Sequence, residues 1–285
     1  MKKESILPYV WMLSGSFSFA VMGCVAHLLG SYCDWQVIAL VRASLALIFS
    51  ATLAVSAGAQ LVFLGPATLW LRSLAGSCSL VCTFFAFTRL PVSDVLTLTN
   101  VFPIWVAILS WPILRERPSA RVWLCVASGV LGVTLIQQPH FAEGNFACLV
   151  ALASSFSTAI AMLGLHRLGA VDPRAIVAHF SGVSISFCIA SFFVFDHATT
   201  VTDIGHGRII LMLLVVGITA TIGQLFLTKA FAAGPAAKVS VVGLSQIVFA
   251  MAFDLFFEQR TLNPLTLLGT GLVMAPIAWL LSRPK

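Results

Sequence analysis

The sequence has little charge, because only 9% of its 285 residues are Asp, Glu, Lys or Arg. A soluble globular domain has roughly 25% charged residues, so this chain lacks the polar side chains that a water-facing surface requires. It also lacks any long polar stretch that could form a separate soluble domain. The composition therefore leaves a polytopic membrane protein as the remaining class.

Several sequence motifs of catalysis and metal binding are missing as well. The sequence has no H-E-x-x-H, no G-x-S-x-G and no Walker A motif, and its six histidines are not spaced as metal ligands. Of its seven cysteines, Cys78 and Cys82 are four residues apart, which is not the spacing of a metal finger. These absences argue against an intramembrane enzyme, a metal site and ATP as the direct driving force. We expect no cofactor, and we expect the thiols to serve as small apolar residues.

The chain is rich in long apolar runs, with 59% hydrophobic residues and a mean hydropathy of +1.02. Backbone groups in lipid must be hydrogen-bonded internally, so a spanning segment is either a helix or a strand of a closed barrel. Barrel strands alternate apolar and polar residues, whereas these runs are continuous over about 20 residues, the length at which a helix crosses a bilayer core. We therefore predict an all-α integral membrane protein. Its ten expected transmembrane helices are 7–29, 36–57, 67–88, 92–114, 121–136, 144–163, 174–195, 208–231, 236–257 and 264–281.

The first apolar run, Leu7 to Leu29, follows Lys2 and Lys3 and so resembles the start of a signal peptide. It is longer than the apolar core of a signal peptide, which has about 7–15 residues, and no clear A-x-A-like cleavage site follows it. We expect it to be a retained first helix.

Lys and Arg in the short connections indicate how the chain is oriented in the membrane. If the N-terminus is inside, twelve Lys and Arg residues, Arg72 among them, fall at inside ends and three at outside ends, and Arg42 lies within a span. We therefore expect a multi-pass protein of the cytoplasmic membrane with both termini in the cytoplasm. The sequence pI of about 9.2 then reflects topology, and we do not expect nucleic acid as a partner.

A repeat relates the two halves of the sequence. At a shift of 145 residues, a polar face with spacing 4, 3, 4 recurs, and this spacing follows one face of a helix. The first copy is Arg72, Gly76, Ser79 and Thr83, and the second is Gly217, Thr221, Gln224 and Thr228. With five spans per half, the second half crosses the membrane in the opposite sense, as in the inverted repeats of secondary transporters, whose site lies between the repeats near the midplane.

The sequence resembles the drug/metabolite transporter superfamily, specifically its EamA-type members, over nearly the whole chain. The resemblance rests on "ALVRASLALI", on "LTNVFPIWVAILSWPILRERPSARVWLCVASGVLGVTLI" and on "TKAFAAGPAAKVSVVGLSQIVFAMAFDLFFEQRTLNPLTLLGTGLV". In each half a glutamate at a helix end, Glu116 or Glu258, precedes a helix that contains a glycine, Gly129 or Gly271.

The resemblance implies two inverted five-helix repeats, 1–140 and 141–285, and a hinge at Pro103 in the fourth span. The second half has "LSQIVF" and no proline at the matching place. The resemblance further implies transport of a small organic solute, often outward. Members of the superfamily handle amino acids, nucleotide-linked compounds, sugars and other metabolites, and the pattern does not choose among them.

Polar side chains inside a membrane are costly, so each is a candidate for the substrate pathway. Their alternative role is to form hydrogen bonds between helices, and aromatic residues can equally serve packing or contact with lipid. The candidate pathway residues are Ser79, Thr83, Asn100, Trp105, Thr221, Gln224, Thr228 and Gln246.

A second group of residues is charged and suited to gating or to ion pairs: Arg42, Asp94, Glu116, Lys229, Lys238 and Glu258. Arg42 is expected to form a structural ion pair near the outer surface with Asp34 or Asp94, or to contact the substrate. The two lysines can instead anchor at the headgroup surface, and the two glutamates can cap helices or pair with neighbouring arginines. His27 and His179 titrate near physiological pH, and either role, proton relay or structural histidine, stays open.

The sequence thus favours a secondary transporter that binds a small molecule and works by alternating access in the lipid bilayer. The alternatives are a channel and a non-transporting membrane protein, and an intramembrane enzyme fits less well. The oligomeric state, monomer or homodimer, stays open.

Overall fold

The computed structural model describes residues 5–87, 89–90, 92–139, 146–194, 206–257 and 263–282. All regular secondary structure in these ranges is helical, and ten segments are long and apolar enough to cross a membrane. The first five spans are α1 (Leu7–Leu29), α2 (Trp35–Ser56), α3 (Ala67–Phe87), α4 (Val92–Thr99) with α5 (Phe102–Leu109) and the π-helix η1 (Ser110–Leu114), and α6 (Ala120–Gln137). The other five are α7 (Phe146–His166), α8 (Pro173–Val194), α9 (His206–Ala233), α10 (Ala236–Gly243) with α11 (Ser245–Phe257), and α12 (Pro264–Ser282).

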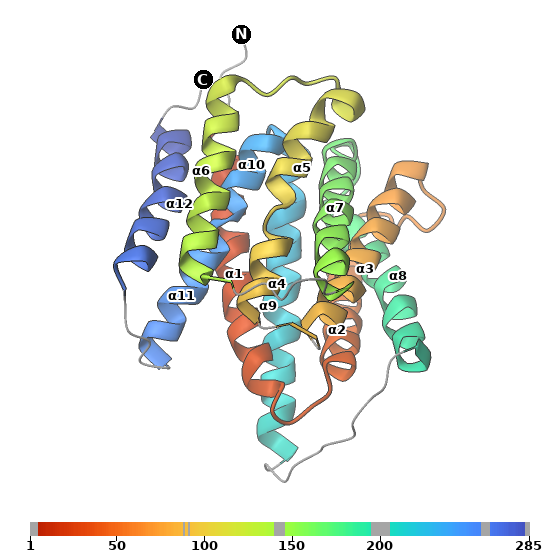
Figure 1. Cartoon of the computed structure of the whole chain (residues 1–285). Coiled ribbons are helices and arrows are strands. Elements are labelled where there is room, and N and C mark those ends of the chain that lie inside the picture. The colour runs from red at the N-terminus through yellow and green to blue at the C-terminus, as the bar shows by residue number, and fades with distance from the viewer. Residues whose placement is uncertain are drawn as a thin grey trace.

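The predicted fold of two inverted five-helix repeats is confirmed. The contacts between helices keep the symmetry of such a pair, because α1 packs on α9 while its counterpart α7 packs on α3. The remaining counterparts meet directly, α2 against α8 and α6 against α12. The helix α1 begins and α12 ends at the same end of the bundle (Figure 1), as an even number of spans requires. The expected boundary at 140/141 lies outside the described residues.

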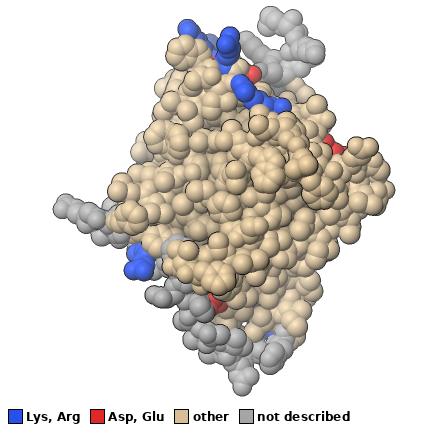
Figure 2. Space-filling view, turned by 90° about the vertical axis from the view of Figure 1, so that its right-hand side faces the viewer, with Lys and Arg blue, Asp and Glu red and all other residues tan. Residues whose placement is uncertain are grey.

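The outer surface of the bundle is apolar around its middle. Large apolar side chains such as Leu131 of α6 and Ile48 of α2 are about half exposed. Figure 2 shows an almost uncharged belt, with Lys and Arg gathered mainly at its upper end. In a water-soluble protein such a surface would be an aggregation hazard, whereas in a bilayer it is the surface that contacts the lipid chains.

Two of the spans are broken near their middle. Between α4 and α5 the helix is interrupted at Asn100 and Val101, just before Phe102 and Pro103, the first two residues of the next segment. The second repeat is broken at the matching place, at Leu244 between α10 and α11, although it has no proline there. At this second break Ser16 of α1 donates a hydrogen bond to the carbonyl oxygen of Gly243, at 3.3 Å. A side chain of the neighbouring helix thus satisfies backbone at the interruption, which is how irregular backbone is tolerated inside a membrane protein.

Small residues bring α6 and α12 close together. A Cβ added at Gly132 would lie 2.6 Å from the carbonyl oxygen of Gly269, and one added at Gly269 would lie 2.6 Å from that of Gly132. Neither position accommodates a larger residue without moving a backbone. Such small-residue crossings are a main means of packing helices in lipid, where apolar burial gives little driving force.

Candidate functional site

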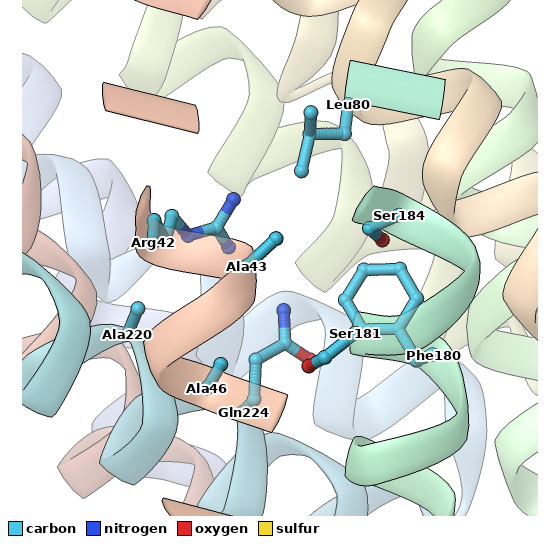
Figure 3. Close-up of a pocket in the computed structure, with 9 residues that line it drawn as sticks. All are labelled: Arg42, Ala43, Ala46, Leu80, Phe180, Ser181, Ser184, Ala220 and Gln224. Carbon is cyan, nitrogen blue, oxygen red and sulfur yellow. The ribbon is translucent and has the colours of Figure 1, made fainter. Parts of the chain in front are cut away.

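A small cavity lies between the two repeats, among α2 and α3 of the first and α8 and α9 of the second. Its volume of about 10 Å³ is close to the minimum that a single water requires. Figure 3 shows the side chains of Arg42 and Gln224 reaching into this space from α2 and α9. It is lined by Arg42, Ala43, Ala46, Leu80, Phe180, Ser181, Ser184, Ala220 and Gln224.

Arg42 lies deeper than the sequence predicted, and its expected ion pair is absent. Within the described residues, neither Asp34 nor Asp94 forms an ion pair with it. Asp34 is the N-cap of α2, about 12 Å away along the helix axis at 1.5 Å per residue. The Arg42 side chain points into the bundle, and its buried Nε has no hydrogen-bond partner. The prediction of an ion pair near the surface is therefore wrong for this structure.

Arg72 of α3 is a site residue that the sequence analysis missed. Its side chain is only 1% exposed, although it was counted among the charges at the inside ends. It donates from Nη2 to Oε1 of Gln224 at 3.1 Å, and its guanidinium stacks 4.0 Å from the ring centre of Phe180. Its Nε is buried without a partner. Gly76 makes room for this side chain, since a Cβ there would lie 2.4 Å from Nη1 of Arg72.

One signal in the sequence did point to Arg72. It is the first member of the face with spacing 4, 3, 4 that continues through Gly76, Ser79 and Thr83. The positive-inside count assigned its charge to topology and hid this pattern. The contributions of Phe180, Ser181 and Ser184 from α8 had no comparable signal, because serine and phenylalanine are common throughout the chain.

Ser79 and Thr83 face α7 instead of lining the cavity. Ser79 Oγ lies 3.0 Å from Ser154 Oγ and 2.6 Å from Thr158 Oγ1. Thr83 Oγ1 lies 2.6 Å from Ser154 Oγ, which also donates to the backbone oxygen of Ser79 at 2.9 Å. These hydroxyl groups form a hydrogen-bonded cluster between the repeats, the alternative role that the sequence left open for them.

The polar candidates on α9 have unequal positions. Gln224 lines the cavity and accepts the hydrogen bond from Arg72. Thr221 donates within its own helix, to the carbonyl oxygen of Gly217 at 2.7 Å. Thr228 is fully buried, and its hydroxyl has no hydrogen-bond partner in the described part of the chain. The structure therefore brings only Gln224 of this face to the cavity wall.

The other predicted pathway residues lie near the helix breaks. Asn100 donates from Nδ2 to the carbonyl oxygen of Leu96 at 2.8 Å. Trp105 donates from its indole nitrogen to Ser155 Oγ of α7 at 3.0 Å. Gln246 is partly exposed close to the start of α11. None of the three lines the cavity beside Arg42.

Most of the charged candidates lie away from the cavity. Glu116 pairs with His166 at 3.5 Å, where a pair with Arg117 was one expectation. Lys229 lies 5.9 Å from the ring centre of Trp11, and Lys238 is partly buried at the start of α10. Asp94 is buried in α4. Glu258 falls outside the described residues.

The two histidines singled out in the sequence differ in their surroundings. His179 Nδ1 lies 2.8 Å from Ser73 Oγ, and its ring meets Trp70 edge-on at 4.7 Å between centroids. These contacts fit the structural role. His27 is exposed near the end of α1.

The chemistry of the cavity is that of binding. Its polar wall consists of the guanidinium of Arg42, the amide of Gln224 and two serine hydroxyls, and Arg72 lies directly behind Gln224. No group of three or more metal-ligating side chains occurs in the described ranges, and all seven cysteines, each of them described, are free thiols. Only Cys188 is fully buried as expected of a thiol in the core, whereas the other six cysteines are partly or fully exposed.

Comparison with known proteins gives consistent results. Residues 6–137 and 145–282 each match the model of the EamA-like transporter family. The chain is 28% identical to the pseudopaline exporter CntI of Pseudomonas aeruginosa strain UCBPP-PA14, over 95% of this chain and 94% of that protein. It is 26% identical to solute carrier family 35 member G1 of Mus musculus, over 68% of this chain and 57% of that protein. A protein of known crystal structure shares the fold with a TM-score of 0.82 and 12% identity, over 95% of each chain.

Proposed function

Because the chain belongs to the EamA-like transporter family, we propose that it is a secondary transporter that moves a small organic metabolite across the cytoplasmic membrane by alternating access. We expect the cargo to be a solute of about the size of an amino acid, such as an amino acid or a related compound. The observation that carries the proposal is the cavity between the repeats, whose wall takes the side chains of Arg42 and Gln224 from opposite repeats.

The shape of the site supports a carrier over a channel. The cavity has room for about one water, so the space beside Arg42 is nearly closed in this conformation. Broken helices flank the interior in both repeats, as they do in many carriers whose substrate site lies near the midplane. A carrier in an occluded conformation has these properties, whereas an open pore would need a continuous polar lining.

The proposed orientation places both termini in the cytoplasm. The connections at the end of the bundle where α1 begins carry the excess of Lys and Arg (Figure 2), and such an excess marks cytoplasmic loops. The relatives include an exporter and a solute carrier, which supports transport, with outward movement as the direction that we favour.

Exchange in liposomes tests this function. Vesicles containing the purified protein are loaded with a defined mixture of amino acids, organic acids, sugars and phosphate esters, and the solutes that leave are identified by mass spectrometry. We expect a subset of the mixture to leave, and to leave faster when the same solute is present outside, because a carrier reorients faster when loaded. Equal efflux with and without solute outside would indicate a channel. Efflux no greater than that from loaded liposomes without the protein would contradict the proposal.

The same assay tests two residues of the predicted pathway. We expect Gln224→Ala to slow exchange by about tenfold, because a hydrogen bond to a charged partner contributes roughly 1.5–3 kcal/mol. Asn100→Ala is expected to slow it as well, since Asn100 donates to the backbone beside the first helix break. Both variants should insert normally, as judged by their yield in the membrane and by size-exclusion chromatography. Unchanged kinetics in both would remove these residues from the pathway.

A further inference from the structure

The cavity and its immediate surroundings hold more hydrogen-bond donors than acceptors. Arg42 and Arg72 each have a buried Nε without a partner. A guanidinium carries five N–H groups and no acceptor. Among the described residues, Arg72 donates to one acceptor, Oε1 of Gln224. The amide nitrogen of the same Gln224 side chain is a further donor (Figure 3).

The two arginines also carry charge that no described residue of the chain balances. Within the described part of the chain, no carboxylate lies within ion-pair distance of either guanidinium. Both positive groups adjoin Gln224, Arg72 through its hydrogen bond and Arg42 through the cavity that it lines together with Gln224, and like charges at such a site repel each other. A buried charge without a partner is strongly unfavourable, and an ionisable residue inside a membrane protein most often marks the path of a substrate or an ion.

We propose that Arg42, Arg72 and Gln224 form a binding site for the carboxylate group of a small organic anion. This inference rests on the proposed transport function and names the chemical class of the cargo. The oxygens of a carboxylate accept the unused N–H groups, and its negative charge offsets the repulsion between the arginines. Ala43, Ala46, Leu80 and Ala220, which line the same cavity, suit the apolar body of such a molecule. The cavity must widen to admit it, since it now has room for about one water.

A carboxylate fits this wall better than two related groups. A zwitterionic amino acid would need an acceptor for its ammonium group, and no described acidic residue lines the cavity. A phosphate ester carries about −1.5 to −2 charges and three strong acceptor oxygens. The wall beside Arg42 consists mainly of small, apolar side chains and offers too few donors to compensate for that charge. Both classes are nevertheless included in the test, as glycine and glycerol 3-phosphate.

Thermal stability of the full-length protein in detergent measures binding without requiring transport. The probes are acetate, benzoate and succinate, each compared with its neutral amide, together with glycerol 3-phosphate, glycine and sodium chloride at matched ionic strength. We expect at least one carboxylate to raise the unfolding temperature, with no comparable shift from its amide. The site assignment would be overturned if the amides stabilise equally, if only glycerol 3-phosphate, glycine or chloride stabilises, or if no carboxylate does.

Substitutions then connect the shift to the named residues. Arg72→Gln and Arg42→Gln should each weaken the binding of the effective carboxylate by about tenfold or more, since a charge-assisted hydrogen bond is lost. Arg89→Gln is the matched control, because Arg89 is exposed and stacks on Phe85 away from the cavity. A wild-type response in both cavity variants would contradict the proposal.

The variant Gln224→Glu separates a loss of binding from a failure to fold, because it should fold normally and still lose the binding of the carboxylate. This change is nearly isosteric and gives Arg72 a carboxylate within the protein itself. We expect the variant to be at least as stable as the wild type without ligand and to lose the shift caused by the added carboxylate. A Gln224→Glu protein that still responds fully to the carboxylate would show that it binds elsewhere.

The exchange assay distinguishes this inference from the transport proposal. If the vesicles exchange only sugars or cationic solutes, the carboxylate site is refuted and the transporter function stands. If carboxylates stabilise the wild type but not Arg72→Gln, and yet no solute leaves the vesicles, the site stands and the transport proposal is refuted.

Discussion

At the scale of single residues, Arg72 shows where sequence reasoning succeeded and where it failed. The repeated face of Arg72, Gly76, Ser79 and Thr83 was visible in the sequence, but the sequence could not show which neighbour each side chain meets. Arg72 turns toward Gln224 and Phe180, whereas Ser79 turns toward α7. A helical face is a stripe wide enough to contact two different helices, so its members divide between a cavity wall and a helix interface.

Gly76 offers a direct test of how Arg72 is held. A Cβ at this position would lie 2.4 Å from Nη1 of Arg72 and 2.8 Å from the Phe180 ring. We therefore expect Gly76→Ala to displace the guanidinium from Gln224 and to destabilise the protein by about 1–3 kcal/mol. Exchange should fall several-fold, as measured in liposomes. Gly182→Ala is the control, because nothing lies within 4 Å of a Cβ added there, and equal effects of the two changes would argue against this packing role.

At the scale of helices, the sequence predicted the number and approximate bounds of the spans, and the family resemblance implied a hinge at Pro103, close to one of the two breaks. Apolar runs of sufficient length predict spans because the bilayer thickness fixes the length that they need. Pro103 marked the first break, since a proline removes a backbone donor. The second break, at Leu244, depends on tertiary contacts with α1 and α6. Ser16 of α1 donates a hydrogen bond to the carbonyl oxygen of Gly243. Leu244 packs against Gly129 of α6, where an added Cβ would lie only 2.6 Å from Cδ1 of Leu244.

The close crossing of α6 and α12 requires glycine at Gly132 and Gly269, and this requirement can be tested. Gly132→Ala would place a Cβ 2.6 Å from the backbone oxygen of Gly269, and a backbone cannot yield as a side chain does. We expect a loss of about 1–3 kcal/mol in stability, seen as a lower unfolding temperature in detergent. Gly271→Ala, whose Cβ meets nothing within 4 Å, should leave that temperature unchanged. If both variants unfold at the wild-type temperature, the close crossing is not present in solution.

At the scale of the whole molecule, the sequence repeat predicted the inverted architecture because an odd number of spans per half reverses the second half. The repeat did not show which helices of the two halves meet. In the structure α1 and α3 pack on α9 and α7, so every one of these helices has its main partner in the other repeat. The cavity follows from this exchange of partners, since its wall takes residues from both repeats.

Cys33, in the connection between α1 and α2, tests the orientation of the whole chain. In a variant that keeps only this cysteine, a membrane-impermeant maleimide should label intact cells. Burial raises the pKa of the Cys33 thiol, and the nearby Asp34 raises it further. Less of the reactive thiolate is therefore present at neutral pH, and labelling should quicken as the pH rises through and above the usual range of a thiol.

The control for this labelling is a single cysteine on the opposite side, Ser119→Cys, at the exposed N-cap of α6. It should react only after the membrane is permeabilised. The reverse pattern, with Cys33 protected and position 119 labelled in intact cells, would place the termini outside.

The interleaving of helices determines which parts of the protein can move as rigid bodies. A rocking motion that separated 1–140 from 141–285 would have to pull α1 from α9 and α3 from α7, which are its broadest helix interfaces. In the proposed alternating-access cycle, the rigid bodies that move must therefore be assembled from both copies of the repeat. For the same reason neither copy expressed by itself would keep its native neighbours, and a chain cut in the 140–145 connection would work only when both fragments are made together.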